Sequence, residues 1–74
     1  YSAELKQLKG LSKEEINAIV PASNSMQTYQ ALVEVVEKAS EDNLSQAQLI
    51  SKIKSLGTSA IKLAKKIPSW AALF

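Results

Sequence analysis

The sequence predicts an all-α fold, a compact bundle of about five short helices around a central third helix. Apolar residues recur three and four positions apart along most of the chain, which is the spacing of one face of a helix. A serine followed three residues later by Glu or Gln, just before an apolar residue, occurs twice, and this is a helix start signal. Because 74 residues support only one modest core, we expect a single helical domain over residues 1–74.

The first two helices are predicted from the residues at their ends. We expect the first helix to lie between Ser2, as its N-cap, and Gly10, as a left-handed terminator. The second helix should begin after Ser12, whose side chain can form a capping box with Glu15. It should end before Pro21, which cannot continue a helix.

The third helix is predicted over roughly residues 25–40, with Asn24 as its cap together with Gln27. Its apolar residues cover more than one stripe, so we expect neighbouring elements to bury much of its circumference. These residues are Met26, Tyr29, Ala31, Leu32, Val33, Val35, Val36 and Ala39.

Two further helices are expected in the last third of the chain. Ser45 and Gln48 repeat the capping-box signal, which predicts a helix start directly after Ser45. Gly57 predicts a break, because a glycine inside a helix costs about 1 kcal/mol relative to alanine. We therefore expect helices over about residues 46–56 and 59–66, with a bend between them.

The residue inventory argues against an enzyme. The chain has no Cys and no His, so it lacks thiolate ligands and the commonest general base and transition-metal ligand. Its two glycines are isolated and form no phosphate-binding loop. We expect no cofactor and no metal site. The acids that follow one another near the end of the third helix are best explained as a solvated face; they are Glu34, Glu37, Glu41 and Asp42.

Charge is distributed unevenly along the chain. Residues 1–42 hold seven acids and four lysines, a net charge of −3, whereas residues 43–74 hold five lysines and no acid, a net charge of +5. Such a split suggests an anionic partner surface, either a membrane or nucleic acid. The other interpretation is that these lysines match acids on the other helices. All nine basic residues are Lys, and the absence of Arg makes nucleic acid the less favoured partner.

The last third combines this positive charge with an apolar, aromatic end. Lysines would attach the chain to anionic headgroups, and aromatic and apolar residues would insert into the membrane interface. The other use of its Ile and Leu side chains is to pack on the third helix and complete the core. After Pro68 ends the last helix, Ser69 is expected to cap a final turn. The candidate contact residues are Lys52, Lys54, Lys62, Lys65, Lys66, Trp70, Leu73 and Phe74.

The segment from Ile50 to Phe74 resembles cationic helical bacteriocins and related secreted antimicrobial peptides. The resemblance rests on its character, which is rich in Lys, free of Arg and acids, and aromatic at its end. It implies a secreted protein that disturbs target membranes, with an anionic membrane surface or a membrane receptor as its partner. The chain starts at Tyr1, and secretion would imply a leader already removed. The acidic first half implies a folded globular state.

An internal echo supports a second hypothesis. Residues 8–16, LKGLSKEEI, align with residues 53–61, IKSLGTSAI, and the shared frame resembles the helix-hairpin-helix motif. A pair of such motifs would imply a non-enzymatic DNA-binding module that grips phosphates through backbone N–H groups. Each copy keeps one glycine of the usual pair, Gly10 in the first and Gly57 in the second. A protein-interaction or immunity-type helical domain, with a protein as its partner, is the other form of this alternative.

Overall fold

The computed structural model describes residues 1–20 and 23–74. Within these residues the only regular secondary structure is helical. Pro21, the predicted stop of the second helix, lies outside the described residues. The five helices are α1 (Ser2–Lys9), α2 (Lys13–Ile19), α3 (Ser25–Glu41), α4 (Gln46–Ser55) and α5 (Thr58–Ala64). The prediction of an all-α bundle of about five short helices is confirmed.

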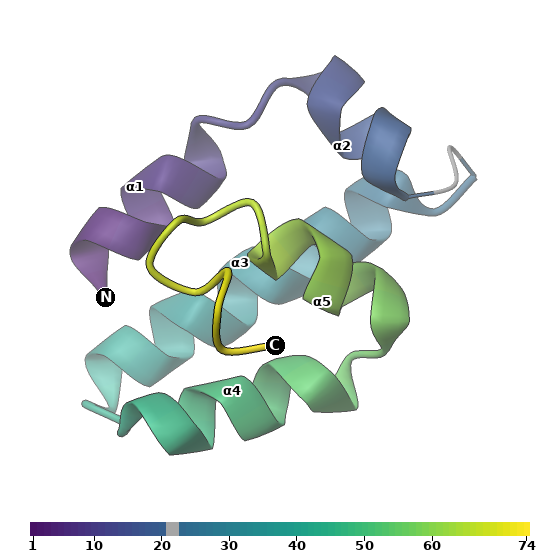
Figure 1. The fold of residues 1–74 in the computed structure, drawn as a ribbon. Helices are drawn as coiled ribbons and strands as arrows, with labels where there is room; N and C mark the ends of the chain where they lie inside the picture. Colours follow the sequence, from purple (N-terminus) through teal and green to yellow (C-terminus); the bar gives the residue numbers. More distant parts are fainter. Residues whose placement is uncertain (21–22) are drawn as a thin grey trace.

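Helix α3 is the element on which the others assemble. It packs against α1, α2, α4 and α5, and α5 also packs against α2 and α4. Figure 1 shows α3 behind the other helices, with the C-terminal segment crossing in front of it between α1 and α5. The five helices form a body of 31 × 22 × 21 Å. A central third helix is therefore what the structure contains.

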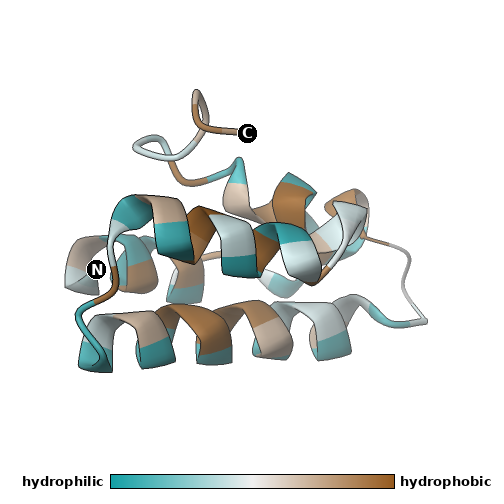
Figure 2. Cartoon of the chain, turned by 90° about the horizontal axis from the view of Figure 1, so that it is seen from below, coloured by the Kyte–Doolittle hydropathy of each residue, from teal (hydrophilic) through white to brown (hydrophobic). Residues whose placement is uncertain are grey.

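The core is built from one apolar face of each helix and from the residues that follow α5. Figure 2 shows hydrophilic and hydrophobic residues alternating along the helices, as expected for amphipathic elements. The large side chains that are fully or almost fully buried are Leu8, Ile16, Val20, Leu32, Val36, Leu49, Ile53, Leu63, Ile67 and Trp70. These residues come from all five helices and from the C-terminal segment, so the whole chain contributes to one core.

Helix α3 is buried on one face and half-buried on the flanks of that face. Its buried apolar residues are Leu32, Val36 and Ala39, while Tyr29 and Val33 are half-buried and Met26 is 40% exposed. Seven of the eight apolar residues named for this helix are thus buried or half-buried, as expected, and only Met26 is exposed.

Both predicted capping boxes are confirmed. The Ser12 hydroxyl accepts from the N–H of Glu15, and the N–H of Ser12 donates to the Glu15 carboxylate, both over 3.1 Å. Ser45 and Gln48 exchange the same two bonds over 3.3 and 3.0 Å. Each box satisfies two backbone donors that a helix start leaves without a partner, so the starts of α2 and α4 are determined locally.

At other helix ends the predicted cap differs in residue or geometry, although α3 begins after Asn24 and α1 ends before Gly10 as predicted. Tyr1, not Ser2, is the N-cap of α1, and Asn24 caps α3 without a side-chain hydrogen bond. Asn24 has φ −135° and ψ 16°, which is not the extended conformation that places a capping side chain over the first turn. Gly10 has φ −80° and ψ −9° and is not left-handed. The chain leaves α1 through a right-handed turn, closed by the N–H of Leu11 on the carbonyl of Leu8.

The break at Gly57 is confirmed, with a shift of one or two residues at the helix ends. Gly57 is the N-cap of α5 and has φ +107° and ψ 177°, a backbone conformation that suits glycine and strains other residues. Helix α5 ends at Ala64, earlier than the expected residue 66. From there the chain continues in successive turns, with backbone bonds such as that from the N–H of Ile67 to the carbonyl of Ala64.

Replacing Gly57 with alanine tests this bend. We expect Gly57→Ala to lower the free energy of unfolding by about 1–2 kcal/mol, because φ +107° is unfavourable for a residue with a Cβ. The matched control is Gly10→Ala, where φ is negative and an added Cβ would lie 3.3 Å from the Gln7 carbonyl oxygen. Urea unfolding followed by circular dichroism should give a change within about 0.5 kcal/mol for the control. Equal losses for the two variants would contradict the bend at Gly57.

Candidate functional site

The five C-terminal lysines, Lys52, Lys54, Lys62, Lys65 and Lys66, are all exposed. The first two lie on α4, Lys62 lies on α5, and the last two follow directly after α5. Within residues 1–20 and 23–74, none of them forms an ion pair. Their side chains are therefore available to an external anionic surface.

Three of these lysines lie at and just after the end of the last helix. Lys62 is on α5, and Lys65 and Lys66 follow it by three and four residues, the spacing of neighbours on a helix surface. Lys65 keeps helical φ and ψ of −64° and −16°, so helical geometry continues past the end of α5. On α4, Lys52 and Lys54 flank the buried Ile53 on its two sides. The helical frame, rather than a contact between the lysines, sets their positions.

Acidic partners for lysines are found elsewhere in the chain. Lys9 pairs with Glu37 over 3.5 Å, and Lys38 pairs with Asp42 over 3.8 Å. All four residues lie within residues 1–42. The interpretation in which the C-terminal lysines match acids on other helices thus finds no ion pair in the part of the chain that the structure describes.

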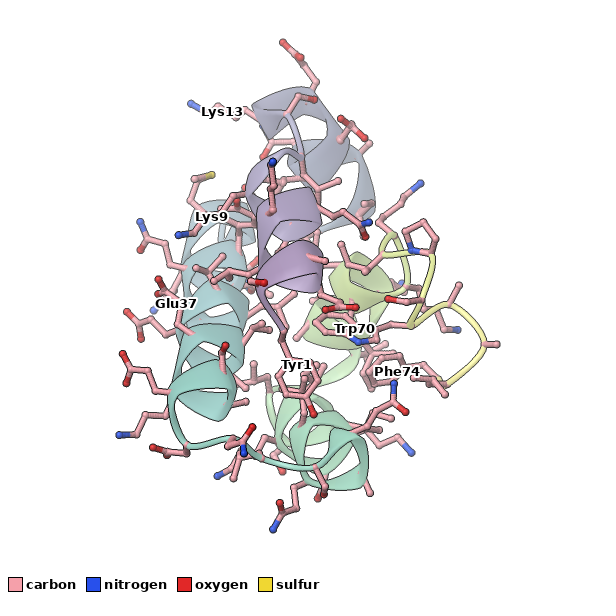
Figure 3. The ribbon with its side chains drawn as sticks, turned by 90° about the vertical axis from the view of Figure 1, so that its left-hand side faces the viewer. Tyr1, Lys9, Lys13, Glu37, Trp70 and Phe74 are labelled. Carbon is pink, nitrogen blue, oxygen red and sulfur yellow. The ribbon has the colours of Figure 1, made fainter. Side chains whose placement is uncertain are left out.

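The C-terminal tail, residues 68–74, is docked on the bundle. Trp70 is only 1% exposed and belongs to the core, whereas Leu73 and Phe74 are half-buried and pack against it. Figure 3 shows the Trp70 side chain lying inward from the tail. Indole burial of this kind is among the largest single apolar contributions to a small core. Of the three tail residues predicted to contact a membrane, Trp70 is thus enclosed in this state.

A hydrogen bond between the two ends of the chain accompanies the docking. The Ser69 hydroxyl donates to the Glu4 carboxylate over 3.2 Å. Ser69 was expected to cap the last turn, but its hydroxyl reaches α1 instead. At the start of the chain, the Tyr1 hydroxyl makes another long-range hydrogen bond, to the Leu44 carbonyl, over 2.6 Å. No spacing in the sequence indicated Glu4 as a partner of the tail, because the two residues are 65 positions apart.

The two halves of the helix-hairpin-helix echo differ in structure. Helices α4 and α5 pack against each other, but α1 packs mainly against α3, and α2 packs against α3 and α5. The two turns also differ, since Gly10 is right-handed and Gly57 has a positive φ. The frame shared in sequence therefore does not produce two structurally equivalent helix pairs.

The structure was also searched for metal sites and membrane spans, and the chain was compared with known proteins. Among the described residues no group of three or more Asp and Glu side chains is arranged to hold a metal ion. In the same residues no helix has the length and hydropathy that a bilayer crossing requires. Comparisons with protein families, with curated proteins and with solved structures find no match.

Two substitutions measure how firmly the tail is held. We expect Trp70→Ala to lower the free energy of unfolding by about 3–5 kcal/mol, because it leaves a large cavity in the core. Ser69→Ala should lower it by less than about 1 kcal/mol, because the bond to Glu4 is exposed. Urea unfolding followed by circular dichroism gives both values. A loss below about 1 kcal/mol for Trp70→Ala would mean that the tail is not part of the core in solution.

Proposed function

We propose that this is a secreted, cationic, helical antimicrobial protein of bacteriocin-like character that acts on anionic target membranes. The observation that carries the proposal is the exposure of the five C-terminal lysines without an ion pair in the described residues. Each lysine near an anionic membrane contributes about 1 kcal/mol of attraction, so five can hold a small protein at the surface. The membrane-facing side is built from α4, α5 and the turns that follow α5.

Attachment and insertion are separate steps in this proposal. The lysines are already exposed, so attachment requires no change in fold. Insertion by Trp70, Leu73 and Phe74 requires release of the tail, because Trp70 is 1% exposed in the folded state. The apolar residues that pack the core cannot enter lipid while they are enclosed. Insertion of the tail into the membrane would have to offset the free energy that is lost when the tail leaves the core.

Neutralising lysines tests the attachment step. The triple variant Lys62→Gln, Lys65→Gln and Lys66→Gln should bind vesicles containing anionic lipid about a hundredfold more weakly, because three contributions of about 1 kcal/mol are lost. The matched control removes the same charge elsewhere, with Lys6→Gln, Lys13→Gln and Lys38→Gln.

Binding is measured by vesicle cosedimentation at physiological ionic strength, with neutral vesicles alongside. Circular dichroism of both triple variants checks that the fold is kept, since lysines near helix ends also interact with the helix dipole. The proposal is wrong if the wild-type protein ignores anionic vesicles, or if the two triple variants lose affinity equally.

Restraining the tail tests the insertion step. The chain has no Cys, so Glu4→Cys and Ser69→Cys would introduce its only two thiols, at positions whose side chains touch in the folded state. Joining them with a short bismaleimide should leave vesicle binding unchanged, while quenching of Trp70 by brominated lipids and dye leakage are both lost. Quenching is the better readout than an emission shift, because Trp70 already lies in an apolar environment.

The unlinked double-cysteine protein, with its thiols blocked singly, is the control. It should bind, be quenched and cause leakage as the wild type does. Leakage that survives the cross-link would show that tail release is not required. Absence of quenching in the wild type would restrict the function to surface attachment.

A further inference from the structure

A groove between α1 and α3 lies outside the membrane-facing side. Its main part is an open hollow of about 480 Å³, lined by Lys9, Tyr29, Gln30, Val33, Glu34 and Glu37. A second hollow adjoins it on α1 and shares Lys9. The two helices run antiparallel, because the Tyr1 hydroxyl meets the Leu44 carbonyl beyond the end of α3, while the Tyr29 hydroxyl meets the Leu8 carbonyl.

The floor of the groove is apolar. Tyr29 and Val33 of α3 and Leu5 of α1 are half-buried and pack on the edge of the core. Met26, which is 40% exposed, lies on the same face of α3, since residues 26, 29, 33 and 37 are spaced three and four apart. One exposed methionine beside three half-buried apolar side chains therefore gives the groove a partly apolar surface.

The two walls of the groove carry opposite charges. Lys6 and Lys9 stand on the α1 wall, whereas Glu34 and Glu37 stand on the α3 wall. The charged ends of Lys9 and Glu37 meet across the groove, 3.5 Å apart, although Lys9 follows Leu8, whose carbonyl meets Tyr29 about two helical turns before Glu37. Figure 3 shows the two residues on neighbouring helices, on the side of the molecule that faces the viewer.

The opposite charges of the two walls make the groove complementary to the groove of a second copy. A two-fold axis that runs along the groove places α1 of one copy over α3 of the other. Since the Lys9 ammonium and the Glu37 carboxylate meet at one point along the groove, each Lys9 ammonium then lies opposite the Glu37 carboxylate of the second copy. Four side chains of alternating sign would enclose the apolar floor. A groove with two acidic or two basic walls would instead repel its own copy.

We propose that the α1–α3 groove is a self-association surface and that its occupant is a second copy of this chain, bound as a two-fold symmetric dimer. A standard interface covers about 800 Å² per partner, just under a fifth of the accessible surface of 4465 Å². Symmetric dimers with self-complementary faces are the commonest soluble oligomers. The face contains none of the five C-terminal lysines, so the inference is independent of the proposed function.

Sedimentation equilibrium tests the proposal on the whole chain. From micromolar to millimolar concentration, the weight-average mass should rise from 8.0 kDa towards twice that value. Lys9→Glu makes both members of the Lys9–Glu37 pair acidic, and Glu37→Lys makes both members basic, while Lys6 and Glu34 are unchanged. Each variant alone should associate at least about tenfold more weakly than the wild type, because like charges then face each other.

Mixing the two variants is the decisive measurement. The mixture should form a heterodimer at least about tenfold more readily than either variant alone, since an acidic pair at positions 9 and 37 then meets a basic pair. The double variant Lys9→Glu with Glu37→Lys should regain association, because the charges of this one pair are only exchanged.

A matched control separates groove charge from net charge. Lys52→Glu changes the net charge as Lys9→Glu does, but it lies on α4 and should leave self-association unchanged. Circular dichroism of each variant confirms that the helices are retained. The proposal is overturned if the wild type stays monomeric up to millimolar concentration, if the mixture does not associate, or if Lys52→Glu weakens association as much as Lys9→Glu. In any of these cases another molecule, or none, occupies the groove.

Discussion

The structure depends on the packing of four helices against the apolar face of α3. Leu32, Val36 and Ala39 form the buried stripe of this helix, and α1, α2, α4 and α5 all lie against α3. A chain of 74 residues buries only about 60% of the surface that it exposes when unfolded. A single long helix that every other helix can contact is an economical way to build one core from short elements, none of which would be stable alone.

The C-terminal tail links this core to the proposed function. The five lysines precede a segment in which Ile67 and Trp70 are buried, so the residues that could insert into lipid also complete the fold. In the last third of the chain the lysines are exposed and can contact a membrane in the folded state. The Trp70 side chain is buried and can do so only after the tail is released. The hydrogen bond from Ser69 to Glu4 places the outer edge of the tail against α1.

Charge separates two sides of the molecule. The lysines of α4, α5 and the following turns form no ion pair in the described residues, whereas Lys9 and Lys38 pair with Glu37 and Asp42. The net charge of +2 hides this difference. An anionic surface would be met by α4 and α5, which leaves the mixed charges of the α1–α3 groove directed elsewhere. Attachment to a surface and association through the groove can therefore occur together.

The sequence by itself determined the helical class, the helix starts at Ser12 and Ser45, and the break at Gly57. These are local properties: capping boxes join residues three positions apart, and the cost of glycine in a helix arises within one residue. The lysine positions followed from the same local spacing. Only the tertiary structure decided that Trp70 is buried, that Glu4 meets Ser69, and that Lys9 meets Glu37. These contacts join residues far apart in the chain, and the packing of several helices at once selects them, so no spacing along the sequence encodes them.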